Sequence, residues 1–258
     1  MPVHLNIAGQ VASVTLDSPG KLNAISVAMW RELARIFGEL ARDDAVRCIV
    51  VGGADGNFAA GADISEFATV RFDQASGRRF HLEILGAAIE AIRTVPQPVI
   101  AAIEGFCIGG GLEIAVACDL RIAVDDARIG APVGKVGFPF ALPELLPLLA
   151  LVGPGVAADL LLAGRVFSGR EAQEAGLVQR AIPRDDHRRV IDEIVRAIVA
   201  GSPAAARQNK AQIRSLLDGG FRYSQAQLEA SFAFLDSDDY REGIAAFLAK
   251  RPPQFAGK

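Results

Sequence analysis

The chain has 258 residues, of which 51% are hydrophobic and 22% charged, and its formal net charge is −3 at pH 7. These values are typical of one globular domain, or of a domain with an appendage, and they exclude an intrinsically disordered chain. The weakly acidic balance gives no indication of a nucleic-acid partner or of a membrane-surface protein.

The first half of the chain predicts an α/β fold. Apolar and polar residues alternate near its start, which predicts a β-hairpin with strands at about 3–7 and 11–16. Apolar residues at helical spacing predict a helix over about 27–42. The short apolar runs "VRCIVVGG" and "PVIAAIEG" predict buried strands. Short strands that alternate with helices indicate a largely parallel sheet.

The pattern changes near residue 185. Four segments beyond it are amphipathic and are bounded by Gly, Ser, Asp or Pro, so each predicts a helix, at 185–203, 204–220, 223–237 and 238–253. We therefore expect an α/β core over residues 1–185 and a helical C-terminal region over residues 186–258.

The cysteines and the absence of a visible leader favour the cytoplasm. Cys48, Cys107 and Cys118 are an odd number in apolar contexts, so we expect buried, reduced thiols. The most apolar stretch, 138–152, contains Glu144, Pro143 and Pro147 and is shorter than the roughly 20 residues of a membrane helix. We expect no membrane partner.

Several common catalytic patterns are missing. The three histidines are far apart in the sequence, so no histidine-based zinc pattern exists. No serine-hydrolase elbow and no P-loop occur, and the fit to a dinucleotide fingerprint is weak. His81 falls on a predicted helix, where we expect an ordinary, partly exposed residue.

Two glycine- and alanine-rich segments stand out, "FAAGADISEF" at 58–67 and "GFCIGGGLE" at 105–113. Each lies beside a predicted helix start, where the first backbone N–H groups have no intrahelical partner and attract negative charge. Two such N–H groups that converge on one oxygen form an oxyanion hole. Either segment alone is as well explained by a tight turn or by close packing.

Taken together and in this order, the segments resemble the enoyl-CoA hydratase/isomerase superfamily, the crotonases. The resemblance covers nearly the whole chain and includes "SPGKLNAIS", "PVIAAIEGFCIGGGLEIAVACDLRIA" and "DDYREGIAAFLAKRPPQF". It implies a spiral of ββα units with a helical C-terminal region that drives assembly into a homotrimer or a dimer of trimers. Some relatives bind RNA, but this chain has no basic stripe that supports such a role.

The resemblance also implies an acyl-CoA substrate and a set of site residues. Ala62 and Gly110 would donate the N–H groups of the oxyanion hole, and Glu113 would transfer the proton. Residues expected along the CoA are Lys21, Leu22, Ala60, Asp63 and Ile64, with Phe247 and Lys250 reaching the CoA of a neighbouring subunit. We expect no metal and no cofactor other than the CoA of the substrate.

One position departs from the pattern of the family's hydratases, which use a second glutamate. Here Val133 stands in that place, and a valine can neither accept a proton nor orient water. The following "GFPFALPELL" also predicts a bulkier and more apolar pocket wall than the usual glycine-rich stretch.

Three alternatives follow for the activity. Enoyl-CoA hydration is the leading one, slow if Glu113 acts alone, and a single base would equally suit double-bond isomerisation. Alternatively another carboxylate takes part, with Glu144 as first candidate and Glu66 and Glu83 as weaker ones. The third alternative is a protein that binds acyl-CoA with little catalysis. Glu113 and Glu144 are also explained simply as first-turn helix residues that the dipole favours.

Overall fold

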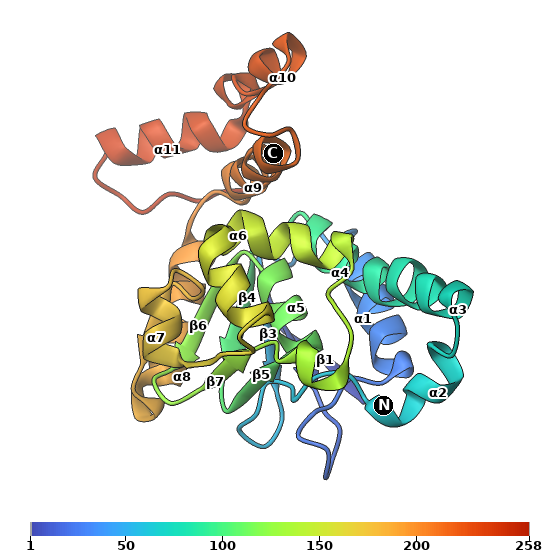
Figure 1. Ribbon diagram of the computed structural model, residues 1–258. Coiled ribbons are helices and arrows are strands. Elements are labelled where there is room, and N and C mark those ends of the chain that lie inside the picture. Colours follow the sequence, from blue (N-terminus) through green and yellow to red (C-terminus); the bar gives the residue numbers. More distant parts are fainter. Residues whose placement is uncertain (1, 258) are drawn as a thin grey trace.

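The computed structural model describes residues 2–257, and strands in this range form two sheets (Figure 1). The larger sheet has the order β1-β2-β3-β4-β6-β9 and the smaller has the order β5-β7-β8. The strands of the larger sheet are β1 Val3–Ala8, β2 Val11–Leu16, β3 Cys48–Gly53, β4 Val99–Ile103, β6 Leu120–Val124 and β9 Arg180–Ile182. Those of the smaller sheet are β5 Phe106–Ile108, β7 Arg128–Gly130 and β8 Val166–Ser168.

The larger sheet is parallel from β2 to β9, as the sequence predicts, because each of its later strands returns through a crossover. Only β1 is antiparallel, and it pairs with β2 as the predicted N-terminal hairpin. The smaller sheet, which the sequence analysis did not resolve, combines one parallel pair, β5 with β7, and one antiparallel pair, β7 with β8.

Helices surround the sheets. They are α1 Val27–Leu40, α2 Phe67–Val70, α3 Gln74–Arg79, α4 Gly86–Thr94, α5 Gly110–Ala117, α6 Leu142–Leu161, α7 Gly169–Glu174, α8 Arg184–Ala200, α9 Pro203–Asp218, α10 Gln225–Ala230 and α11 Asp238–Leu248. A π-helix, Phe80–Leu85, connects α3 to α4, and single 3-10 turns span Ile64–Glu66, Val133–Val136 and Ala233–Asp236. Helix α1 matches the predicted start and ends two residues before the predicted end.

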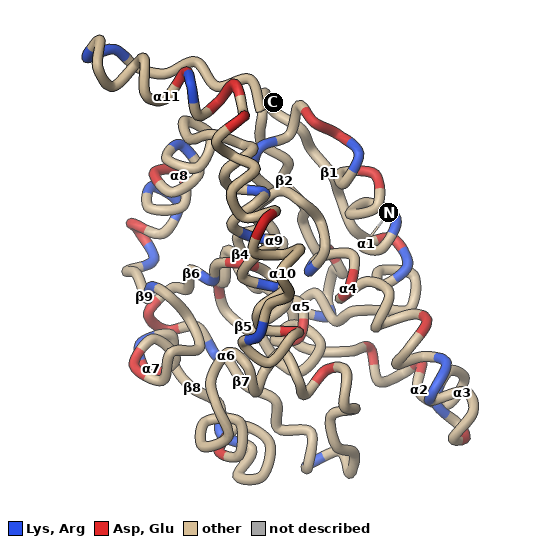
Figure 2. The backbone as a smooth tube through the Cα atoms, turned by 90° about the horizontal axis from the view of Figure 1, so that it is seen from above, with Lys and Arg blue, Asp and Glu red and all other residues tan. Residues whose placement is uncertain are grey.

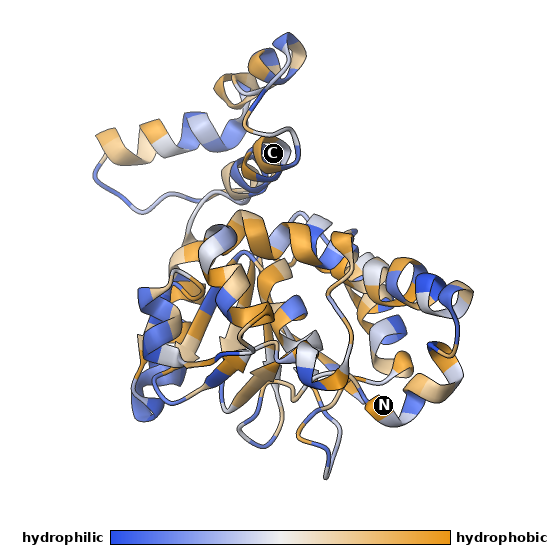
Figure 3. Ribbon diagram, viewed as in Figure 1, coloured by the Kyte–Doolittle hydropathy of each residue, from blue (hydrophilic) through white to orange (hydrophobic). Residues whose placement is uncertain are grey.

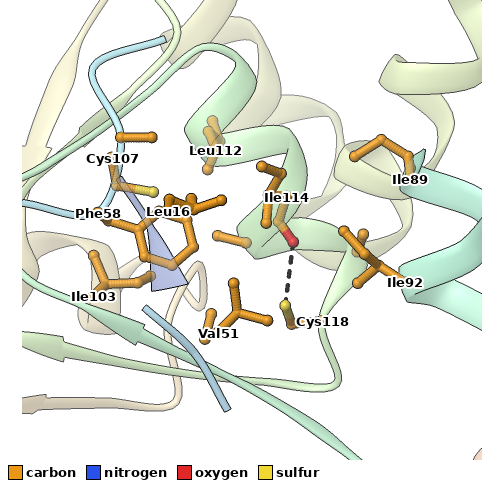
Figure 4. Packing of buried hydrophobic residues seen from close by; sticks show 14 of the residues in the cluster. Leu16, Val51, Phe58, Ile89, Ile92, Ile103, Cys107, Leu112, Ile114 and Cys118 are labelled. Atoms are coloured by element: carbon orange, nitrogen blue, oxygen red, sulfur yellow. Dashed lines mark hydrogen bonds between the residues drawn. The ribbon is translucent and has the colours of Figure 1, made fainter. Parts of the chain in front are cut away.

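The main hydrophobic core lies between the larger sheet and helices α1, α4 and α5 (Figure 4). Helix α5 is apolar except for Glu113, and its Leu112 and Ile114 are buried in this core. Cys118, just after the helix, donates its thiol to the carbonyl of Ile114 at 3.3 Å. All three cysteines are buried and free, as predicted. Glu113 therefore lies on a closely packed, almost wholly apolar helix.

The other face of the larger sheet is covered by α8, whose Val190 and Ile191 pack on Ile100 and Ile122 in a second core cluster. The buried residues of α8 are Val190, Ile191 and His187, and hydrophilic residues colour much of its ribbon (Figure 3). Helices α9 to α11 extend away from this body (Figure 1). The expected division at residue 185 stays a prediction, and the helices that leave the sheet begin with α9.

One predicted C-terminal helix is wrong in its extent. Residues 223–237 form the short helix α10 and a separate 3-10 turn, and not one continuous helix. The side chain of Gln208 donates to the carbonyls of Ala230 and Ser231, and the Ser231 hydroxyl donates to Leu228 O. Side chains therefore take carbonyls that a continuing helix needs for its own backbone.

Helix α6 is long and apolar enough to cross a membrane by length and composition alone. Its backbone is nonetheless broken at Gly153, where φ is 69° and ψ is 175°, so two shorter helical pieces meet there. Glu144 lies in the first piece and is buried.

Lys and Arg are interspersed with Asp and Glu along most of the chain (Figure 2). An exception to their surface placement is Arg121, which is only 3% exposed. Its guanidinium donates to Ala115 O at 3.2 Å and Cys118 O at 2.7 Å, at the end of α5, and to Leu177 O at 3.0 Å. A cation at the C-terminal end of a helix interacts favourably with the negative end of the helix dipole, so Arg121 stabilises the end of α5.

We expect Arg121→Met to lower the free energy of unfolding by at least about 2 kcal/mol, because several buried carbonyls lose their donor. Urea unfolding measures the change, and the exposed Arg180→Met is the matched control. A loss in Arg121→Met no larger than in the control would contradict this role.

Candidate active site

Two segments that are distant in the sequence are joined by backbone hydrogen bonds. Ala59 N donates to Phe106 O at 2.7 Å, and Ile108 N donates to Ala59 O at 2.9 Å, so the chain at Ala59 runs parallel to β5. A second parallel bridge joins Ala62 to Ile25: Ile25 N donates to Gly61 O at 2.7 Å, and Asp63 N donates to Ile25 O at 2.9 Å. The positions of Ala62 and of the start of α5 are thereby fixed relative to each other.

The N–H groups of Ala62 and Gly110 are neighbours in this arrangement. A Cβ built on Gly110 would lie 3.6 Å from Ala62 N. Within residues 2–257, neither N–H donates to a backbone carbonyl in a turn, loop or bridge. Gly110 is also the first residue of α5, whose N–H has no intrahelical acceptor. Both residues line one cavity, so two unpaired donors meet at its wall.

The three glycines before Glu113 each meet a different constraint. Gly109 has φ of +50° and ψ of −112° at the N-cap of α5. A Cβ on Gly110 would lie 3.1 Å from the Trp30 ring, and a Cβ on Gly111 would lie 2.6 Å from Ala59 O. Gly111 therefore permits the close approach of α5 to the Ala59 segment, which brings the two donors together.

The sequence predicts a helix start beside each of the two glycine- and alanine-rich segments, but the first segment, 58–67, leads into a different structure. Ala62 precedes Asp63, which caps only a single 3-10 turn, Ile64–Glu66. A turn this short contributes little dipole. The positive end of a helix is thus supplied by α5 alone, while Ala62 contributes one oriented N–H.

The cavity has a volume of about 100 Å³ and an apolar wall with three polar side chains. The polar ones are Glu113, Arg71 and His81. The apolar ones include Val133, Val136, Phe138, Phe80 and Leu85. Val133 lies where the sequence predicts it, and its surroundings are as bulky and apolar as expected. Glu113 is nevertheless accompanied by two other polar side chains at this wall, Arg71 and His81.

Glu113 Oε2 is buried and has no hydrogen-bond partner among the described residues. Burial raises the pKa of this carboxyl well above its ordinary value near 4.5, because the charged form loses its hydration. The negative charge of Glu144 raises the pKa further, and Arg71 opposes both effects. The pKa of Glu113 stays above its ordinary value although the residue lies in the first turn of α5, where the helix dipole favours the charged form.

Arg71 is held by aromatic rings at the cavity wall. Its guanidinium carbon lies 4.4 Å from the ring centroids of Phe67 and Phe138, and 5.7 Å from that of Phe80. Burial lowers the pKa of Arg71, although Glu144 and Glu113 act in the opposite direction. An arginine remains charged in proteins, so this residue supplies the positive field of the site.

Five of the residues expected along the CoA lie in the first 64 positions of the chain, and two of them line the cavity. Ala60 and Ile64 line it, and Ala60 N donates to Leu22 O at 2.9 Å. Lys21 Nζ lies 2.7 Å from Asp63 Oδ2, and this ion pair raises the pKa of Lys21. Exposed Leu22 and Ile64 form an apolar rim there.

Phe247 and Lys250 lie apart from this group, at the end of α11. Phe247 is 82% exposed, and neither residue lines the cavity of its own chain. Their expected contact with the CoA of a neighbouring subunit stays a prediction.

The three carboxylates considered as substitutes occupy different places. Glu66 Oε2 accepts from Val27 N at 2.7 Å at the start of α1, and Glu83 is exposed. Glu144 Oε2 accepts from Ala141 N at 3.1 Å, as the helix-start explanation predicts. Glu144 also lines a small cavity together with Glu113, and its Oε1 contacts His81 Nδ1. None of the three lines the larger cavity.

Sequence reasoning missed two polar residues of the site, Arg71 and His81. His81 is partly exposed, as expected, but it also lies at the cavity wall and contacts the buried carboxylate of Glu144. A signal was available at Gly86, where a glycine interrupts a helical pattern. A Cβ there would lie 2.7 Å from His81 O, because the chain makes a wide π turn.

Comparisons with known proteins find similar sequences over nearly the whole chain. The model of the family described as enoyl-CoA hydratase/isomerase matches residues 6–258. A short-chain-enoyl-CoA hydratase of Clostridium acetobutylicum is 32% identical over 259 residues, which cover 96% of this chain and 95% of the relative.

Solved structures extend the likeness to the fold. An enoyl-CoA hydratase/carnithine racemase from Magnetospirillum magneticum is 38% identical, with a TM-score of 0.97, over 100% of this chain and 96% of that one. An enoyl-CoA hydratase from Bacillus anthracis is 28% identical, with a TM-score of 0.89, and each chain covers 100% of the other. The predicted α/β fold of ββα units with a helical C-terminal region is therefore confirmed.

The raised pKa of Glu113 predicts a pH dependence of stability. The unfolded chain releases this proton near pH 4.5 and the folded chain keeps it to higher pH, so the folded state of the wild type loses stability as the pH rises through that window. Glu113→Gln lacks this loss. We expect its stability relative to the wild type to increase from pH 5 to pH 8, by up to about 1.4 kcal/mol per unit of pKa shift.

Chemical unfolding at several pH values measures this difference. The exposed Glu83→Gln should follow the wild type at every pH. Parallel curves for the wild type and Glu113→Gln would contradict a raised pKa.

Proposed function

The chain belongs to the enoyl-CoA hydratase/isomerase family, a family of enzymes, and on that premise we propose that it adds water to 2-enoyl-CoA thioesters. The observation that carries the proposal is the pair of unpaired N–H groups, of Ala62 and Gly110, at the wall of a cavity that also contains buried Glu113. Two converging donors next to one proton-transfer group suit a reaction in which charge develops on a carbonyl oxygen.

The two donors would bind the thioester oxygen. Addition at Cβ of an enoyl thioester places negative charge on that oxygen as an enolate forms. A donor aimed at developing charge in a water-poor site contributes more than it would in water, and loss of one such donor typically costs about 3–4 kcal/mol of transition-state stabilisation. The glycines next to Gly110 allow the substrate carbonyl to approach the backbone closely.

Glu113 would transfer the proton at Cα. Its apolar surroundings raise the pKa of the carboxyl, so that the protonated form can give its proton to the enolate carbon, and the resulting carboxylate takes a proton back from solvent. A positioned acid or base of this kind contributes about 10²–10⁴-fold in rate.

The CoA part of the substrate would lie at the rim that contains Lys21, Leu22, Ala60, Asp63 and Ile64. The exposed ammonium of Lys21 suits the phosphates of CoA, and the apolar rim suits its pantetheine chain. No metal or further cofactor enters this mechanism. The three buried, reduced thiols support a cytoplasmic location.

A second activity is favoured by Val133 at the cavity wall. A single carboxyl at Cα suffices to move a proton along an acyl chain, so double-bond isomerisation needs no second glutamate. The third alternative, binding with little catalysis, would leave the same cavity occupied without turnover.

We also propose that the chain assembles through its C-terminal helices, as a homotrimer or a dimer of trimers. Large apolar side chains are exposed there, among them Phe221 at 77%, Phe247 at 82% and Leu248 at 75%. Apolar groups that gather on one region of a soluble chain mark an interaction surface. Assembly would also bring α11 close to the site of another subunit.

Hydration is tested by incubating the protein with crotonyl-CoA in D₂O and following the thioester by mass spectrometry. We expect addition of one water by the wild type and a loss of at least about 10²-fold in Glu113→Gln. Glu83→Gln is the matched control. Isotope exchange or double-bond movement without water addition would favour the isomerase, and binding alone would favour the third alternative.

Assembly is tested by light scattering. We expect the wild type to have three or six times the mass of one chain, and Phe221→Glu combined with Leu248→Glu to have a lower mass, because buried carboxylates oppose association. Ile7→Glu, at an exposed position of the N-terminal hairpin, is the control. A monomeric wild type would overturn the proposed assembly.

A further inference from the structure

His81 and Glu144 form a hydrogen-bonded pair beside the cavity. His81 Nδ1 contacts Glu144 Oε1, and the two side chains are 15% and 3% exposed. The described residues contain two further histidine–carboxylate pairs: His4 with Asp17 at 2.8 Å, whose side chains are 51% and 29% exposed, and His187 with Glu104 at 3.2 Å, whose side chains are 3% and 38% exposed. Of these three pairs, the first is the one in which neither side chain is more than 15% exposed, and its histidine lines the cavity that contains Glu113.

Local backbone geometry directs His81 toward the site. The π-helix Phe80–Leu85 widens one turn between α3 and α4, and its residues Phe80, His81 and Leu85 all line the cavity. Wide turns of this kind are uncommon and occur frequently at functional sites. Phe80 also packs edge-on against the imidazole, with ring centroids 5.3 Å apart, which limits the orientations of His81.

The pair also determines which imidazole nitrogen is available. An ionised Glu144 accepts from the Nδ1–H of His81, which leaves the lone pair on Nε2. Among residues 2–257, no hydrogen bond joins Nε2 to another group, since the contact of His81 is made through Nδ1. A neutral imidazole held in this tautomer can accept a proton at Nε2.

We propose that His81, oriented by Glu144, is the second proton-transfer group of this site and takes the part for which Val133 offers no carboxylate. The inference rests on the proposed hydration. It differs from the expectation that Glu144 itself acts, because Glu144 lies behind His81 and outside the larger cavity.

The step balances as follows. Nε2 of His81 takes one proton from a water molecule as its oxygen forms the bond to Cβ, and the Cα–Cβ π electrons move onto the thioester oxygen. The N–H groups of Ala62 and Gly110 hold the enolate. The enolate then takes the proton of Glu113 at Cα. Proton return from the imidazolium to the Glu113 carboxylate, through solvent, restores the site without an oxidant or a further reactant.

The other charged groups around His81 are compatible with this division of work. Glu113, on α5, and Arg71, just after α2, line the cavity with His81, while Glu144, on α6, contacts His81 from outside it. The imidazolium formed in the step stays in contact with the carboxylate of Glu144, which is its counter-ion. Arg71 has the opposite charge to Glu144. Glu144 is therefore a positioning residue in this scheme.

The experiment compares two reactions of the whole protein in D₂O. Hydration of crotonyl-CoA needs both groups, whereas exchange of the α-protons of butyryl-CoA needs Glu113 and the oxyanion hole but no attacking water. We expect His81→Gln to lose hydration by at least about 10²-fold and to retain α-proton exchange. Glu113→Gln should lose both. Glu144→Gln should lose part of kcat in hydration with little change in KM.

Chemical rescue separates catalysis from structure. We expect added imidazole to restore part of the hydration in His81→Ala and none in Glu113→Gln. His4→Gln is the matched control and should keep both reactions.

Each outcome decides the inference. Hydration that His81→Gln retains within about threefold of the wild type, or an equal loss of both reactions, would overturn the role of His81 while the proposed function stands. A wild type that does not hydrate crotonyl-CoA would overturn the proposed function and, with it, this role.

Discussion

Two backbone hydrogen bonds join Ala59 to strand β5, and the geometry of the site depends on them. They hold the segment at Ala59 parallel to β5. Ala62, three residues after Ala59, and Gly110, two residues after the end of β5, therefore present neighbouring N–H groups. The approach is close enough that a Cβ on Gly111 would lie 2.6 Å from Ala59 O. The arrangement is built from backbone atoms, which cannot be removed by changing a side chain and which need no reorganisation when charge develops.

Around these donors, four ionisable side chains share an apolar shell. The Oε2 atom of Glu113 is buried without a hydrogen-bond partner in the described part of the chain, and burial together with Glu144 raises the pKa of this carboxyl. Arg71, enclosed by phenylalanines, reduces that effect, and His81 lies between the cavity and Glu144. Groups in a low-dielectric environment interact strongly, so the charges of Glu144 and Arg71 both act on the pKa of Glu113.

The same shell explains how the site stays in place. Helix α5 is buried on nearly all sides, and its end is held by the buried guanidinium of Arg121. The π-helix that contains His81 contacts both α1 and α4, and the ring of its Phe80 lies beside the guanidinium of Arg71. Proton-transfer groups on two rigid elements can keep a fixed separation, as catalysis by positioned groups requires.

Much of the fold follows from local patterns. The N-terminal hairpin, α1, the buried strands β3 and β4 and most C-terminal helices follow from hydrophobic periodicity and turn residues, because these features depend on neighbours in the sequence. The extent of the predicted helix at 223–237 is wrong because Gln208, from another helix, takes two of its carbonyls. The smaller sheet escaped prediction because its strands have only three residues each.

The site divides in the same way. The sequence by itself determined that Glu113 follows a glycine triplet at the start of a helix and that position 133 has no carboxylate, because both are properties of contiguous residues. Only the tertiary structure decided that Glu144 lies behind His81 and that His81 and Arg71 enter the cavity. Residues 81 and 144 are 63 positions apart, and their contact depends on how a π-helix and α6 are placed, which no local pattern specifies.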